Sequence, residues 1–148
     1  LKLSRGLGDV YKRQDYRLDN MILKNNEVVG ILDWELSTLG HPIADFSYHC
    51  LSWRTQEAFW DQAKLKELGI PSEKEYMEMY CENSGKDLSK NWEFYMAFNM
   101  FKIAGILQGI LGRVRDGTAA SKHAEERGNM VFPLSEAAWS TIEENFLK

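Results

Sequence analysis

Two short runs of β-forming residues, separated by a pair of asparagines, most restrict how this chain can fold. Residues 21–24 (MILK) and 27–32 (EVVGIL) are rich in aliphatic side chains, and only Asn25 and Asn26 stand between them. Asparagine tolerates a positive φ angle, which the two-residue turns of β-hairpins require. The sequence therefore predicts one antiparallel hairpin over these two runs.

Beyond a loop at residues 36–42, the apolar residues take up helical spacing. Ser72 and Glu75 form a Ser-x-x-Glu capping box, which predicts the start of a helix. Pro133 is expected to separate or kink the last helices. The predicted α+β chain is mostly helical, with one hairpin followed by five or six helices over residues 43–53, 55–68, 73–83, 91–114, 119–128 and 134–147.

Composition excludes several classes of protein. The chain has 148 residues, 44% of them hydrophobic, which suits one compact unit with a core. Its net charge of −4 argues against a nucleic-acid partner, which would need a basic stripe. The best apolar run, residues 103–111, is shorter than the roughly 18 residues of a membrane helix. Cys50 and Cys81 have no metal-type spacing, so we expect a reduced, cytoplasmic protein without membrane partners.

Side chains with metal-ligating oxygens stand at both ends of the predicted hairpin. Asp15 and Asn20 precede it in DYRLDN, and Asp33 follows it in ILDWE. The two ends of a hairpin lie close together, because its strands are about 4.8 Å apart. Magnesium takes few oxygen ligands from protein and the remainder from phosphate and water. Asn20 and Asp33 could therefore hold Mg²⁺, while Asp15 could accept a proton from an attacking hydroxyl.

The order of these residues is typical of kinase-like phosphoryl transfer. There, Asp-x-x-x-x-Asn precedes a hairpin and a metal-binding Asp follows it. Ordinary turn chemistry is the alternative, because Asp and Asn both favour turns. For Asp19 we expect the turn role, whereas the combined spacing of the other three favours phosphotransfer.

The segments DYRLDN, ILDWE, LGHPIADFSY and QGILGRVRDGTAAS resemble the C-terminal lobe of aminoglycoside-phosphotransferase-type kinases. The resemblance covers about residues 15–148. It is strongest to the branch associated with acyl-CoA metabolism, which includes kinase domains fused to acyl-CoA dehydrogenases in animals. A protein-kinase-like lobe is therefore implied, with the hairpin carrying the catalytic and metal-binding loops.

The resemblance also implies roles for matching residues, with ATP and Mg²⁺ as cofactors. Asp15 would be the catalytic base, and Asn20 and Asp33 would be magnesium ligands beside the nucleotide. Glu35 would support the metal or a bound water. Asp45 would brace the catalytic loop through hydrogen bonds to its backbone.

The chain departs from this family in two respects. Arg13-Gln14 stand where the family usually has His-Gly, and glycine permits backbone shapes that glutamine resists. Residues 1–14 lack helical or strand periodicity, so we expect them to be irregular and not native to the domain. The N-terminal lobe, with its phosphate-covering loop and strand lysine, has no counterpart here. We therefore expect a fragment, residues 15–148, that is inactive without the missing lobe.

The acceptor is inferred from the resemblance alone. A hydroxyacyl-CoA is the first choice and an aminoglycoside or amino alcohol is the second. A non-catalytic, kinase-like scaffold is a third class. Arg113 and Arg115 lie near a predicted helix end. There they could interact favourably with the helix dipole, or they could bind the phosphates of a coenzyme A ester. Arg17 could steer an anionic substrate. The expected partners are the missing lobe and an acyl-CoA dehydrogenase, separate or fused.

Overall fold

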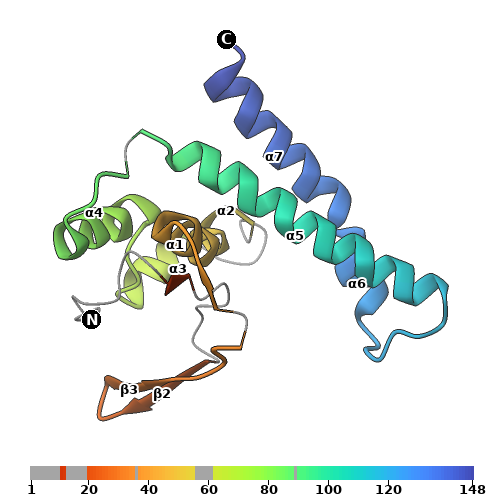
Figure 1. Ribbon diagram of the computed structural model, residues 1–148, viewed down its shortest axis with the longest axis horizontal. Helices are drawn as coiled ribbons and strands as arrows, with labels where there is room; N and C mark the ends of the chain where they lie inside the picture. Colours follow the sequence, from red (N-terminus) through yellow and green to blue (C-terminus); the bar gives the residue numbers. More distant parts are fainter. Residues whose placement is uncertain (1–10, 13–19, 36, 56–61, 89) are drawn as a thin grey trace. The chain divides into compact units, whose positions relative to one another are not determined.

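The computed structural model describes residues 11–12, 20–35, 37–55, 62–88 and 90–148 (Figure 1). It is mostly helical, with two small antiparallel sheets of two strands each in the described part. The chain divides into two compact units, Leu1–Trp92 and Glu93–Lys148. The first unit holds all the strands that the structure describes, so the α+β prediction is confirmed.

The predicted hairpin is present in the first unit (Figure 1). Strand β2, Met21–Lys24, pairs with β3, Glu27–Ile31. Asn25 and Asn26 have φ angles of 52° and 62°, as a turn of type I′ requires. The register shifts between Ile22 and Leu23, and such a bulge increases the local twist of a ribbon.

A second pairing was not foreseen. Strand β1, Tyr11–Lys12, pairs with β4, Thr38–Leu39, in antiparallel register. The expectation that residues 1–14 are wholly irregular is therefore wrong at positions 11 and 12. A two-residue strand is too short to show alternation, and its partner lies far along the chain. The expectation that residues 1–14 are foreign to the domain stays a prediction.

The helices of the first unit follow the hairpin. They are α1 (Pro42–Cys50), α2 (Ser52–Thr55), α3 (Gln62–Glu67) and α4 (Glu73–Ser84). The helix predicted over residues 43–53 is split, because α1 ends at Cys50. The amide of Leu51 donates to the Tyr48 carbonyl at 3.3 Å, three residues back, which tightens the last turn.

Helix α4 begins and ends where its sequence predicts. The Ser72 hydroxyl accepts from the Glu75 amide at 3.3 Å, and the Glu75 carboxylate accepts from the Ser72 amide at 2.8 Å. Gly85 follows the helix with a φ of 69°, and its amide donates to the Cys81 carbonyl. Left-handed backbone of this kind carries little strain in glycine, so Gly85 ends α4.

The core of the first unit combines aliphatic side chains, such as Leu51 and Leu88, with the aromatic rings of Phe46 and Trp92. Phe46 of α1 stacks on Tyr80 of α4, with ring centroids 3.9 Å apart. Beside them, Glu73 accepts hydrogen bonds from the Arg54 guanidinium at 2.7 Å and from the Trp92 indole at 2.7 Å. Burial, and then the charge of Glu73, raise the pKa of the Cys50 thiol, so this cysteine stays protonated and unreactive.

The second unit contains most of α5, which spans Trp92–Arg115, and all of α6 (Ala124–Asn129) and α7 (Val131–Phe146). Pro133 lies in the first turn of α7. There the missing amide proton has no acceptor within the helix, so proline is tolerated. The break expected at Pro133 falls instead at Met130, which caps both α6 and α7.

Helix α5 passes a length and composition test for a membrane span. Its most apolar stretch of 18 residues has a mean hydropathy of 1.3, and 28% of that stretch is buried. A single helix of this kind is weak evidence, because the core helix of a soluble protein passes the same test. The expectation of no membrane partner stays a prediction.

Candidate functional site

The base of the β2–β3 hairpin brings Asn20 and Asp33 together. The Asn20 amide nitrogen Nδ2 donates to the Asp33 oxygen Oδ2 at 3.4 Å. The backbone supports this contact, because the Leu32 amide donates to the Asn20 carbonyl at 2.8 Å. Both side chains are half-buried. Two of the predicted site residues, thirteen positions apart in sequence, are thus neighbours in space.

The backbone after β3 is held in an uncommon shape. Asp33 has a φ of 62°, which strains most residues but is tolerated by Asp and Asn. The Trp34 indole donates to the Ile31 carbonyl at 2.7 Å, and the Ser37 amide donates to the Trp34 carbonyl at 2.9 Å. These bonds fix the turn that carries Asp33. Trp34 itself is 51% exposed.

The Asn20–Asp33 pair has the right donor atoms for a hard divalent cation. A carboxylate oxygen is already in place, and rotation of the Asn20 amide would turn its oxygen toward the same point. Within the described residues, no group of three His, Cys, Asp or Glu side chains could hold a metal ion. Mg²⁺ usually takes few oxygens from protein and completes its coordination with oxygens of phosphate and water.

The other predicted residues around this pair are less fully described. Asp15 and Arg17 lie outside the described residues. Glu35 is exposed two positions after Asp33. Asp45 is half-buried in the first turn of α1. Of the loop that Asp45 is expected to brace, the structure describes only Asn20, so the predicted roles of these residues stay predictions.

Arg113 and Arg115 lie in the last turn of α5, and both are exposed. The Arg115 guanidinium is 3.5 Å from the Asp116 carboxylate. The amides of Gly117 and Thr118 donate to carbonyls of the last turn, and Gly117 has a φ of 69°, so the helix ends in a Schellman motif. This position supports the dipole role without excluding a substrate role.

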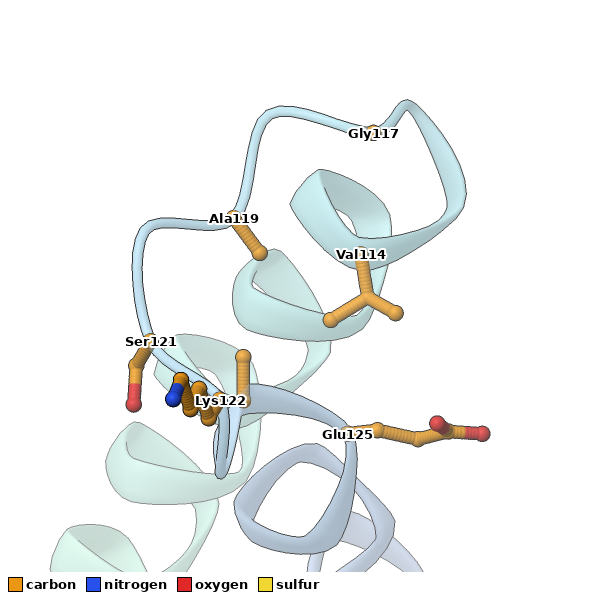
Figure 2. Close-up of a pocket in the computed structure, with 7 residues that line it drawn as sticks. Val114, Gly117, Ala119, Ser121, Lys122 and Glu125 are labelled. Atoms are coloured by element: carbon orange, nitrogen blue, oxygen red, sulfur yellow. The ribbon is translucent and has the colours of Figure 1, made fainter.

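A pocket of about 250 Å³ lies beside this helix end (Figure 2). Its lining includes one cationic side chain, Lys122, and neither of the two arginines. Figure 2 shows the Glu125 carboxylate pointing away from Lys122. The pocket is lined by Val114, Gly117, Ala119, Ser121, Lys122, Ala124 and Glu125. Phosphate binding by Arg113 and Arg115 therefore stays a prediction that this pocket does not support.

Ser37 is a residue that sequence reasoning missed. Its hydroxyl is buried and has no hydrogen-bond partner in the part of the chain that the structure describes. Buried polar atoms are nearly always paired, so an unpaired one beside the turn of Asp33 is notable. A single serine in a loop gives no local signal from which this could be predicted.

Comparison with known proteins agrees with the phosphotransferase resemblance of the sequence. Residues 14–80 match the phosphotransferase enzyme family. The chain is 43% identical over 132 residues to acyl-CoA dehydrogenase family member 10 of Mus musculus. It is 36% identical over 138 residues to acyl-CoA dehydrogenase family member 11 of Homo sapiens. The two alignments cover 84% and 89% of this chain, but only 12% and 18% of those proteins.

A solved structure is also similar. It is a crystal structure from Ralstonia eutropha JMP134 described as a candidate aminoglycoside phosphotransferase. The TM-score is 0.80 at 44% identity, and the match covers 90% of this chain and 42% of that chain. The fold is thus similar to that of a kinase-like phosphotransferase. The chain is similar over residues 14–80 to the phosphotransferase enzyme family, and the relatives are named as acyl-CoA dehydrogenase family members.

Proposed function

We propose that this chain is the C-terminal lobe of a small-molecule kinase, which as a longer polypeptide transfers the γ-phosphoryl group of ATP to a hydroxyl. The observation that carries the proposal is the 3.4 Å contact between Asn20 and Asp33 at the base of the hairpin. In the proposal these two residues hold Mg²⁺ beside the nucleotide phosphates. Glu35 supports the metal or a water bound to it, and Asp45 braces the catalytic loop.

Asp15 takes the role of catalytic base in this proposal. Support comes from the pairings on either side of it. Lys12 pairs with Thr38, and Asn20 is bonded to Leu32 and Asp33. The segment that contains Asp15 is therefore joined at both ends to the stretch around Asp33, which favours a shared site.

Phosphoryl transfer depends mainly on how the protein positions the reactants and neutralises their charge. Asp15 orients the acceptor hydroxyl and receives its proton as the new O–P bond forms, and ADP leaves. When bound, Mg²⁺ supplies positive charge to the phosphate oxygens. Asn20 and Asp33 would hold the ion at the base of the hairpin. The hairpin thus positions the charge before the substrate binds.

For the acceptor we propose a hydroxyacyl-CoA or a related acyl intermediate, in a cytoplasmic enzyme. The names of the relatives support this choice. An aminoglycoside or amino alcohol is the second candidate, supported by the description of the similar crystal structure. Partners would be the N-terminal lobe and an acyl-CoA dehydrogenase, fused or separate. Arg17, Arg113 and Arg115 are the proposed contacts for an anionic acceptor.

The test is Mg²⁺-dependent ATP binding by the longer natural polypeptide that contains this chain, measured by calorimetry. Asp33→Asn is the decisive variant, because asparagine tolerates a φ of 62° but lacks the charge. We expect its Mg²⁺-dependent affinity to fall by at least about tenfold, or 1.4 kcal/mol. Asp116→Asn, at the exposed end of α5, is the matched control and should bind as the unmodified protein does. Equal binding by both variants would instead indicate a non-catalytic scaffold.

A further inference from the structure

Helix α7 carries a row of exposed aromatic side chains. Phe132, Trp139 and Phe146 are 69%, 51% and 47% exposed. They recur in steps of seven residues, which is close to two helical turns, so they form one stripe along the helix. The buried residues of α7 lie on a different side of it, namely Val131, Leu134 and Ala138. We call these three aromatic residues the α7 row.

The middle member of the α7 row is fixed in place. The Trp139 indole nitrogen donates to the Glu143 carboxylate at 2.6 Å, one turn further along the helix. This hydrogen bond favours one rotamer of the exposed indole. Large aromatic side chains that are ordered before binding are the usual anchors of protein interfaces, because little side-chain entropy is lost on association.

The negative charge of α7 limits which kinds of partner can cover the α7 row. The helix contains no lysine or arginine, and Glu136, Glu143 and Glu144 are exposed. Glu136 lies four residues after Phe132, and Glu143 four after Trp139, so carboxylates border the row. A second α7 packed on the first would bring like charges together. An anionic membrane surface would be repelled for the same reason.

We propose that the α7 row and its bordering glutamates form a docking surface for a cationic amphipathic helix of another protein. The apolar side of that helix packs against Phe132, Trp139 and Phe146. Its lysine and arginine side chains pair with Glu136 and Glu143. Exposed large apolar side chains that gather on one face and have a polar border often mark an interaction site. This inference is independent of the proposed kinase activity.

The probe is a synthetic helical peptide with one leucine row flanked by lysines, and its twin has glutamates in place of the lysines. Both are titrated into the 148-residue chain by calorimetry at physiological ionic strength. We expect the lysine peptide to bind at least about tenfold more tightly than its twin. The double variant Phe132→Ala/Trp139→Ala should lose this binding.

Two further variants separate charge from contact. Glu143→Gln keeps an acceptor for the Trp139 indole but removes the negative charge. It should therefore weaken the binding of the lysine peptide and leave the binding of the glutamate peptide unchanged. Met79→Ala/Glu82→Gln, an exposed pair on α4, is the matched control and should bind as the unmodified chain does. Equal binding of the lysine peptide to the α7 double variant would overturn the proposal. So would self-association of the chain that the double variant abolishes, because a second copy would then cover the row.

Discussion

Among single residues, Asp33 joins a chemical role to a backbone constraint. Its carboxylate lies beside Asn20, and its φ of 62° is one that β-branched or bulky residues resist. Asp and Asn tolerate this shape because their short polar side chains can bond to nearby backbone. The position therefore admits very few residue types, and only aspartate also supplies a negative charge.

Gly128 meets a different constraint, which is space. A Cβ atom at this position would overlap the Leu111 side chain and lie 2.5 Å from its Cγ. Gly105 is the contrasting case, because a Cβ there would have no atom within 4 Å. Both glycines are helical, so alanine would gain up to about 1 kcal/mol of helix propensity at either position.

We predict opposite signs for these two substitutions. Gly105→Ala should raise the free energy of unfolding by about 0.5–1 kcal/mol. Gly128→Ala should lower it by about 1–3 kcal/mol, because the new Cβ would overpack the half-buried Leu111 side chain. Urea unfolding measures both, and adding Leu111→Ala to Gly128→Ala should recover part of the loss. An equal gain from both alanines would mean that Leu111 moves aside freely.

Among the elements, α4 shows how local chemistry sets a boundary. Ser72 and Glu75 satisfy each other's backbone amides at the start of the helix. The hydrogen bonds from Ser72 lower the pKa of Glu75 from its usual 4.5, because they favour the ionised carboxylate. A carboxylate with a lowered pKa stabilises the folded state above pH 4.5, and this contribution is lost as the pH falls through the folded-state value.

We predict a matching pH dependence for variants of the cap. Ser72→Ala should lower the stability by about 1 kcal/mol at neutral pH. For Glu75→Gln, the stability deficit relative to the unmodified chain should shrink as the pH falls below 4.5. Thermal unfolding between pH 3 and pH 7 measures this, with Glu82→Gln as the exposed control on the same helix. A deficit that stays constant across this range would show that Glu75 does not couple the cap to pH.

Elements that are formed by residues close together in sequence could be predicted, whereas those formed by residues far apart could not. The hairpin turn at Asn25-Asn26 and the cap at Ser72 depend on neighbours in sequence, and both were predicted correctly. The pairing of β1 with β4 depends on residues far apart, so no local pattern announced it. The closeness of Asn20 and Asp33 followed from the hairpin, whereas the buried hydroxyl of Ser37 depends on tertiary surroundings that a sequence does not display.

At the scale of the whole molecule, the described chain holds one side of a proposed two-sided site. After rotation of the Asn20 amide, the pair of Asn20 and Asp33 would offer two protein oxygens for a cation. A kinase must also hold the adenine and cover the phosphates. The match to the similar crystal structure covers 42% of that chain, so the remaining parts of the proposed reaction are expected from the rest of a longer polypeptide.

We therefore predict that the 148-residue chain alone releases no ADP above the uncatalysed rate. The reason is positional, because without a covering lobe the γ-phosphate is not held in line with a hydroxyl next to Asp15. A coupled ADP assay with Mg²⁺, ATP and a hydroxyacyl-CoA measures this, and circular dichroism checks that the chain is folded. The longer natural polypeptide should turn over in the same assay. Turnover by the chain within about tenfold of the longer protein would contradict the two-sided site, since chemistry at that rate needs near-complete transition-state stabilisation.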